Sequence, residues 1–153
     1  MTFDLSIRPA RPEERLELIE LQRRASLANP GDREVLLAHP EAIDLPSAMI
    51  ELGDVLVAER DGVRLGFAAI APRDDGQIEL DGLFTEPANW NGGVGRALVR
   101  AAGELSRSRG AGILHVIGNP HALGFYERCG FIAVGEFKTQ FGVGVLMTLD
   151  LGR

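Results

Sequence analysis

The apolar residues of the chain recur with a period of two in seven segments, and this alternation predicts strands. In each segment apolar and polar side chains alternate, or a short apolar run is bounded by turn residues. Pro9 ends the first segment, and Asp61-Gly62, a typical two-residue hairpin turn, joins the second to the third. The predicted strands cover residues 3–7, 54–59, 63–71, 77–85, 113–117, 131–137 and 143–149.

Helical spacing predicts the remaining elements. The clearest helix begins at Val94 and stops at Gly110, with apolar residues on one face and charged residues on the other. An earlier helix starts near Pro12, and Asn29-Pro30-Gly31-Asp32 is predicted to break the chain after it. Shorter helices are expected: one or two within residues 32–53, the second over 46–52, and another over 121–128.

The order of these elements, β-α-α-β-β-β-α-β-α-β-β, predicts the fold class. Hairpins give antiparallel strand pairs, whereas the strand–helix–strand passage over residues 77–117 gives a parallel pair. We therefore expect a single domain over residues 1–153 of the α/β (α+β) class. Its sheet should be mixed and mostly antiparallel, with a central parallel strand pair and flanking helices.

The stretch from Leu83 to Leu98 carries the most specific chemical signal. A strand leads through a glycine-rich loop into the N-terminus of a helix, whose unpaired amides and dipole can bind an anion. Two common phosphate motifs do not fit. A P-loop needs a lysine after the loop, but the only lysine is Lys138, and a dinucleotide fingerprint needs Gly or Ala where Leu98 stands. A phosphate site and a plain glycine-rich turn both stay open on this stretch alone.

Composition narrows the function classes. A net charge of −6 argues against nucleic-acid binding and suits a cationic substrate. The single cysteine, Cys129, excludes a disulfide framework and fits a reducing cytoplasm, while the three histidines lack metal-ligand spacing. No apolar run reaches the ~18 residues of a membrane span, and the first residues do not resemble a signal peptide. We expect a cytoplasmic protein that binds no metal, nucleic acid or membrane.

Two motifs, in this order, resemble the Gcn5-related N-acetyltransferase (GNAT) family. Residues 83–87, Leu-Phe-Thr-Glu-Pro, followed by Gly-Val-Gly at 93–95, are similar to the family's pyrophosphate-binding loop. Trp90 departs from the usual Gln or Arg, and Asn91 stands where a glycine is common. Residues 119–131 are similar to the family element Asn-x-x-Ala-x-x-Phe-Tyr-Glu-x-x-Gly-Phe. The resemblance implies a GNAT-like acyl-CoA N-acyltransferase fold, in which two parallel strands splay around the pantetheine arm of acetyl-CoA.

The resemblance also implies an activity and its residues. The expected activity is transfer of an acetyl group from acetyl-CoA to a primary amine, of a small molecule or a protein, by direct attack in a ternary complex. Tyr126, the only tyrosine, occupies the place of a general acid that protonates the leaving thiolate. Asn119 would contact the CoA arm, although Asn before Pro is also a good helix N-cap. The residues implied in cofactor binding are Leu83, Phe84, Thr85, Trp90, Asn91, Gly92, Gly93, Val94, Gly95, Arg96, Asn119 and Phe125.

The general base has two candidates, and loss of the amine proton to solvent is a third alternative. A period of two places Gln77, Glu79, Asp81 and Leu83 on one face of their strand, with Ile78, Leu80 and Phe84 facing a core, and makes Asp81 one candidate. His115, on the adjacent strand, is the rival because histidine titrates near neutrality. We expect the acceptor site beside Asp81, between residues 30–53 and 138–144. The alternative function is a CoA-binding sensor or regulatory module without turnover, and assembly as a homodimer stays open.

Overall fold

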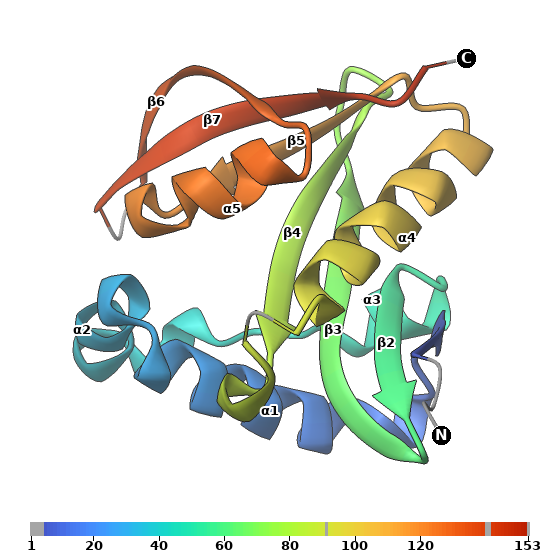
Figure 1. The fold of residues 1–153 in the computed structure, drawn as a ribbon, viewed down its shortest axis with the longest axis vertical. Coiled ribbons are helices and arrows are strands. Elements are labelled where there is room, and N and C mark those ends of the chain that lie inside the picture. Colours follow the sequence, from blue (N-terminus) through green and yellow to red (C-terminus); the bar gives the residue numbers. More distant parts are fainter. Residues whose placement is uncertain (1–4, 91, 140–141, 153) are drawn as a thin grey trace.

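The computed structural model describes residues 5–90, 92–139 and 142–152. Its strands form one sheet in the order β1-β2-β3-β4-β5-β7-β6 (Figure 1). All neighbouring strands are antiparallel except β4 and β5, so the predicted mixed sheet with one parallel pair is confirmed. The strands are β1 (Ser6–Pro9), β2 (Val55–Arg60), β3 (Val63–Pro72), β4 (Ile78–Thr85), β5 (Ile113–Gly118), β6 (Ile132–Thr139) and β7 (Gly142–Asp150).

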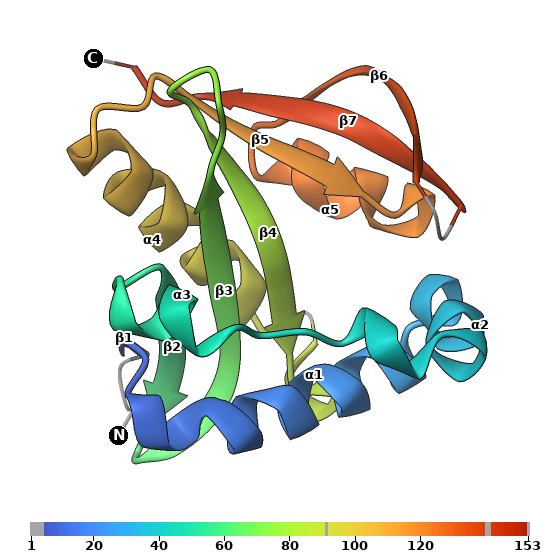
Figure 2. The same ribbon diagram turned by 180° about the vertical axis from the view of Figure 1, so that it is seen from behind.

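Helices cover both faces of the sheet. α4 lies against one face and packs with β2 to β5 around a core that includes Leu80, Leu98 and Leu114. α1 and α3 lie against the opposite face, around a second core that includes Leu18 and Phe67 (Figure 2). The helices are α1 (Arg15–Ala28), α2 (Pro30–Ala38), α3 (Ser47–Glu51), α4 (Val94–Ser108) and α5 (Leu123–Arg128). None of the described helices offers a stretch long and apolar enough to cross a membrane.

The parallel strands β4 and β5 pair over a very short length. Only Ile78 with Leu114 and Glu79 with His115 are in register, after which the two strands diverge (Figures 1 and 2). β5, β7 and β6 thus form an arm that leans away from the β1–β4 part of the sheet. The splayed strands that the family resemblance implied are therefore present.

Two predicted turns have different outcomes. Asp61 and Gly62 both have positive φ, 57° and 79°, as a type I′ hairpin turn requires, and this prediction is confirmed. The predicted break at residues 29–32 is much shorter than expected, because α1 ends at Ala28 and α2 begins at Pro30. The Asn29 side chain accepts a hydrogen bond from the Gly31 amide and caps α2, with proline at its first position.

The expected alternation along β4 is wrong beyond Leu80. Ile70 pairs with Leu80 but Ala69 pairs with Gly82, so Asp81 is an extra residue without a partner, which makes a β-bulge. The bulge reverses the alternation, since Leu83 packs in the α4 core together with Leu80. Leu83 therefore does not share the face of Glu79. Phe84 packs against the second core, on the α1 side.

Candidate active site

Two adjoining cavities open where β4 and β5 diverge. The first, here called the α4 cavity, has a volume of about 550 Å³ and lies between the end of β4, the start of α4 and α5. The second, the α2 cavity, has a volume of about 270 Å³ and is lined by α1, α2, β4 and β5. The residues that line both are Asn29, Asp32, Leu83, Phe84, Ala122 and Tyr126.

The α4 cavity collects most of the residues predicted to bind the cofactor. Leu83, Phe84, Thr85, Trp90, Gly93, Val94, Gly95, Arg96 and Phe125 all line it. Gly92 lies in the same loop but not in the cavity wall, and Asn119 lines the α2 cavity instead. Asn91 lies outside the described residues.

The start of α4 forms part of the wall of the α4 cavity. Gly93 precedes the helix with φ of 86°, and no side chain caps this end. The first amides of an α-helix have no intrahelical acceptor, and the residues that carry them here, Val94, Gly95 and Arg96, line the α4 cavity.

Two contacts shape the loop before this helix. A Cβ atom on Gly95 would lie 3.1 Å from Cζ of Phe125, so glycine allows the Phe125 ring to pack directly on the helix backbone. The indole Nε1 of Trp90 donates a hydrogen bond of 3.2 Å to the backbone oxygen of Thr85. The residue that departs from the family pattern, Trp90, thus connects the loop to the end of β4 through a hydrogen bond.

Tyr126 stands where the two cavities meet. It is 8% exposed, and its ring makes edge contacts with Phe125 and Phe131 at centroid distances of 5.2 and 5.4 Å. A Cβ atom on Gly118 would lie 3.2 Å from the tyrosine ring, so the end of β5 also touches it. Burial raises the pKa of Tyr126, and the hydroxyl therefore keeps its proton throughout the neutral range.

Asp32, which the sequence did not single out, lies beside Tyr126. Its Oδ1 accepts a hydrogen bond of 3.1 Å from Nδ2 of Asn119, while Oδ1 of Asn119 accepts from the His121 amide. Burial raises the pKa of Asp32, and the Asn119 bond and His121 act in the opposite direction. In sequence, Asp32 follows Asn29-Pro30-Gly31 and is indistinguishable from an acidic residue in the first turn of a helix.

The candidate base Asp81 lines the α2 cavity only. It protrudes from the bulge in β4, and burial together with the nearby Asp44 raises the pKa of its carboxyl group. An anionic side chain at this wall of the cavity can attract a cationic ligand.

The rival candidate, His115, lines neither cavity. It is paired with Glu79, where β4 and β5 are still hydrogen-bonded. Its Nε2 is buried and has no hydrogen-bond partner among the described residues. Burial and Arg73 lower the pKa of His115, while Asp75 raises it. The structure therefore does not bring His115 together with Tyr126.

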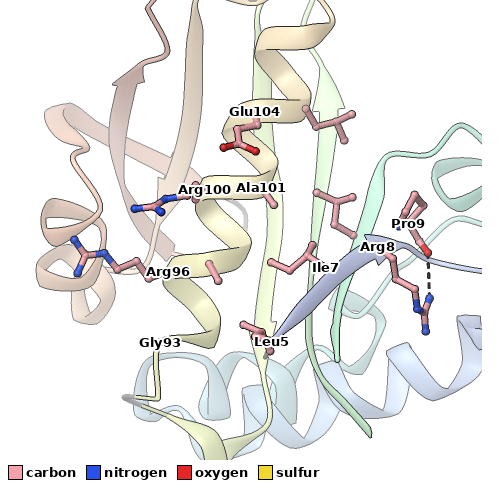
Figure 3. Close-up of a pocket in the computed structure, with 12 residues that line it drawn as sticks. Leu5, Ile7, Arg8, Pro9, Gly93, Arg96, Arg100, Ala101 and Glu104 are labelled. Atoms are coloured by element: carbon pink, nitrogen blue, oxygen red, sulfur yellow. Dashed lines mark hydrogen bonds between the residues drawn. The ribbon is translucent and has the colours of Figure 1, made fainter. Parts of the chain in front are cut away.

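A further cavity of about 720 Å³ lies between β1 and α4 (Figure 3). Leu5, Ile7 and Ala101 line it, and the side chains of Arg96 and Arg100 project from α4 at its side. None of the candidate catalytic residues lines this cavity. No group of three or more metal-ligating side chains is found in the described part of the chain.

Comparison with known proteins identifies one family. A model described as an acetyltransferase (GNAT) domain matches residues 51–133, which is more than half of the chain. The matched region runs from α3 into β6 and contains both motifs and the residues around Tyr126. No curated protein matches the sequence.

Solved structures of acetyltransferases share the fold. A GCN5-related N-acetyltransferase (aminotransferase, class-II) from Rhodopseudomonas palustris is 24% identical with a TM-score of 0.75, and the match covers 98% of each chain. YncA of Salmonella typhimurium, solved with acetyl-CoA, is 23% identical with a TM-score of 0.73, over 98% of this chain and 95% of that one. PaiA N-acetyltransferase of Thermoplasma acidophilum, solved with coenzyme A, is 19% identical with a TM-score of 0.75, over 96% and 99%.

Proposed function

Because the chain belongs to the GNAT acetyltransferase family, we propose that it transfers the acetyl group of acetyl-CoA to a primary amine by direct attack in a ternary complex. The observation that carries this proposal is the pair of adjoining cavities with Tyr126 in the wall of both. The α4 cavity contains the start of α4, whose amides can bind an anion, and the α2 cavity is lined by the carboxylates of Asp32 and Asp81, of which Asp32 also lines the α4 cavity. Such a pair suits a nucleotide thioester on one side and a cationic acceptor on the other.

The ligand that we propose for the α4 cavity is acetyl-CoA. In our proposal the pyrophosphate binds the amides of residues 93–96 at the start of α4, whereas the Gly92 amide already donates to the backbone oxygen of Asn89. The pantetheine arm lies between the splayed strands, with its amides paired to the backbone of residues 83–85 as an added strand. Asn119 is placed by the same proposal at the CoA arm, in addition to the capping role that its Oδ1 already has. Structures of YncA and PaiA with acetyl-CoA and coenzyme A support the choice of ligand.

The chemistry requires two proton transfers at the reacting groups. The amine must lose a proton before its nitrogen can attack the thioester, and the leaving sulfur must gain one. Tyr126 is the proposed donor to sulfur, since its hydroxyl group stays protonated at neutral pH. Asp81 is the proposed anionic group at the acceptor side, because it lines the α2 cavity. His115 is the weaker candidate, because it lines neither cavity.

The second candidate function is a CoA-binding module without turnover. What favours it is the departure at Trp90, whose indole bonds the Thr85 oxygen that an added pantetheine strand would use. A carbonyl oxygen can accept two hydrogen bonds, so this contact does not prevent the pantetheine interaction.

Two measurements test the proposal. Acetyl-CoA and CoA should raise the unfolding temperature of the protein, because a ligand that binds only the native state stabilises it, whereas NAD should not. Thiol release from acetyl-CoA should then be followed with butylamine, 1,4-diaminobutane, lysine and a peptide with a free N-terminus. A shift with NAD but not with CoA would contradict CoA binding. Binding of acetyl-CoA without thiol release for any amine would favour the module.

A further inference from the structure

Among the described residues, Asp32 and Tyr126 are the only ionisable side chains at the junction of the two cavities. Asp32 lines both the α4 cavity and the α2 cavity, as Tyr126 does. Asp81 lines the α2 cavity alone. Of the two carboxylates, Asp32 is therefore the one that stands at the junction where acceptor and thioester must meet.

The carboxylate of Asp32 is held in position at this junction. Nδ2 of Asn119 donates to its Oδ1, across a separation of 87 residues in sequence. Gly31 makes this approach possible, because a Cβ atom there would lie 2.1 Å from Nδ2 of Asn119. A carboxylate can accept hydrogen bonds at both oxygens, so Oδ2 can accept one from an ammonium group in the cavity.

We infer that Asp32 holds the acceptor ammonium group beside Tyr126 and removes its proton, an inference that rests on the proposed acetyl transfer. A proton passes from the ammonium nitrogen to the Asp32 carboxylate, which frees the nitrogen lone pair. The C–N bond then forms as the C–S bond breaks, and Tyr126 donates its proton to the leaving sulfur. The new amide nitrogen loses its second proton to the Tyr126 oxygen, and Asp32 releases its proton to water. One proton is released for each acetyl group transferred.

Asp32→Asn removes the negative charge but can keep the hydrogen bond with Asn119. Asparagine keeps an oxygen that can accept from Nδ2 of Asn119, but it can neither pair with an ammonium ion nor take its proton. At pH 7, kcat/KM for the most active amine of the panel should fall roughly 10²-fold, the lower end of general-base contributions. The affinity for acetyl-CoA alone, measured by calorimetry, should stay unchanged.

The pH profile distinguishes a base from a structural residue. Among the described residues, the titratable groups that share a cavity with Asp32 are Asp81 in the α2 cavity, Tyr126 in both, and Arg96, His121, Arg128 and Cys129 in the α4 cavity. Helix α1 lines the α2 cavity with the neutral side chains Gln22 and Ser26. An alkylamine has a pKa of about 10.4, so its neutral fraction rises about tenfold for each pH unit between 7 and 9. The deficit of Asp32→Asn should therefore shrink as the pH rises to 9.

The control is Glu34→Gln, which removes a carboxylate from the exposed side of the same helix and should keep wild-type kinetics. Wild-type kinetics in Asp32→Asn, or a deficit that is equal at pH 7 and pH 9, would overturn the inference. A wild-type protein that releases no thiol with any amine would instead refute the proposed function.

Discussion

Replacement of Tyr126 by phenylalanine tests the proposed proton donor most directly. The substitution removes one hydroxyl group and keeps the ring, so the edge contacts with Phe125 and Phe131 and the contact with Gly118 should persist. The free energy of unfolding should therefore change little, because the ring that makes these contacts is kept. Acetyl-CoA should bind as tightly as before.

The size of the rate effect follows from the burial of Tyr126. A positioned general acid typically contributes roughly 10² to 10⁴-fold. Burial raises the pKa of Tyr126, so its hydroxyl is a weaker acid than a free thiol, whose pKa is about 8.5. Proton transfer to sulfur is therefore uphill, and the thiolate leaves fairly well without help. We expect the lower end, a roughly 10²-fold loss in kcat, or about 2.7 kcal/mol in the activation barrier.

The assay is steady-state thiol release at saturating acetyl-CoA and amine, from pH 6 to pH 9. The loss should appear in kcat and should be smaller at pH 6, where solvent can protonate the sulfur. Thermal unfolding of the variant, with and without acetyl-CoA, checks that fold and binding survive. A variant that turns over at the wild-type rate across this pH range would show that Tyr126 only packs.

Four further substitutions probe other parts of the molecule. Asp81→Asn should raise KM for the amine or lower kcat without changing acetyl-CoA affinity. His115→Gln should leave amine kinetics unchanged, because His115 lines neither cavity. The opposite pattern would identify His115 as the base. Gly95→Val should weaken acetyl-CoA binding measured by calorimetry, because the valine side chain would displace the Phe125 ring. The same substitution should lower the free energy of unfolding by roughly 1–3 kcal/mol. Unchanged affinity would show that this contact plays no part in acetyl-CoA binding. Glu14 is buried, and its hydrogen bonds to Arg8 lower its pKa from 4.5 to about 2. The ionised carboxylate therefore contributes about 3 kcal/mol of stability above pH 4.5. This contribution is lost as the pH falls toward 2. Urea unfolding should show Glu14→Gln less stable than the wild type by about that amount at pH 7 and about equally stable at pH 2; a constant difference would contradict the linkage.

The sequence by itself determined the elements and both motifs, because these depend on neighbours along the chain. Alternation and helical spacing fix which face of each element is apolar, and Asp61-Gly62 sets its turn through the φ values that these residues tolerate. The glycine loop before Val94 likewise specifies a helix start with free amides. From these features the mixed sheet could be predicted, while the two motifs carried the resemblance to the family and named nine of the residues that line the α4 cavity.

Only the tertiary structure decided how side chains from distant segments meet. The bulge at Asp81 arises from the pairing of β4 with β3, and its single extra residue reverses the faces that alternation predicts for Leu83. The register of β4 with β5 leaves His115 at the closed end of the splay and outside the cavities. Asp32, in α2, is held at the site by a hydrogen bond from Asn119, which follows β5. Such contacts depend on packing between elements far apart in sequence, which no local pattern records.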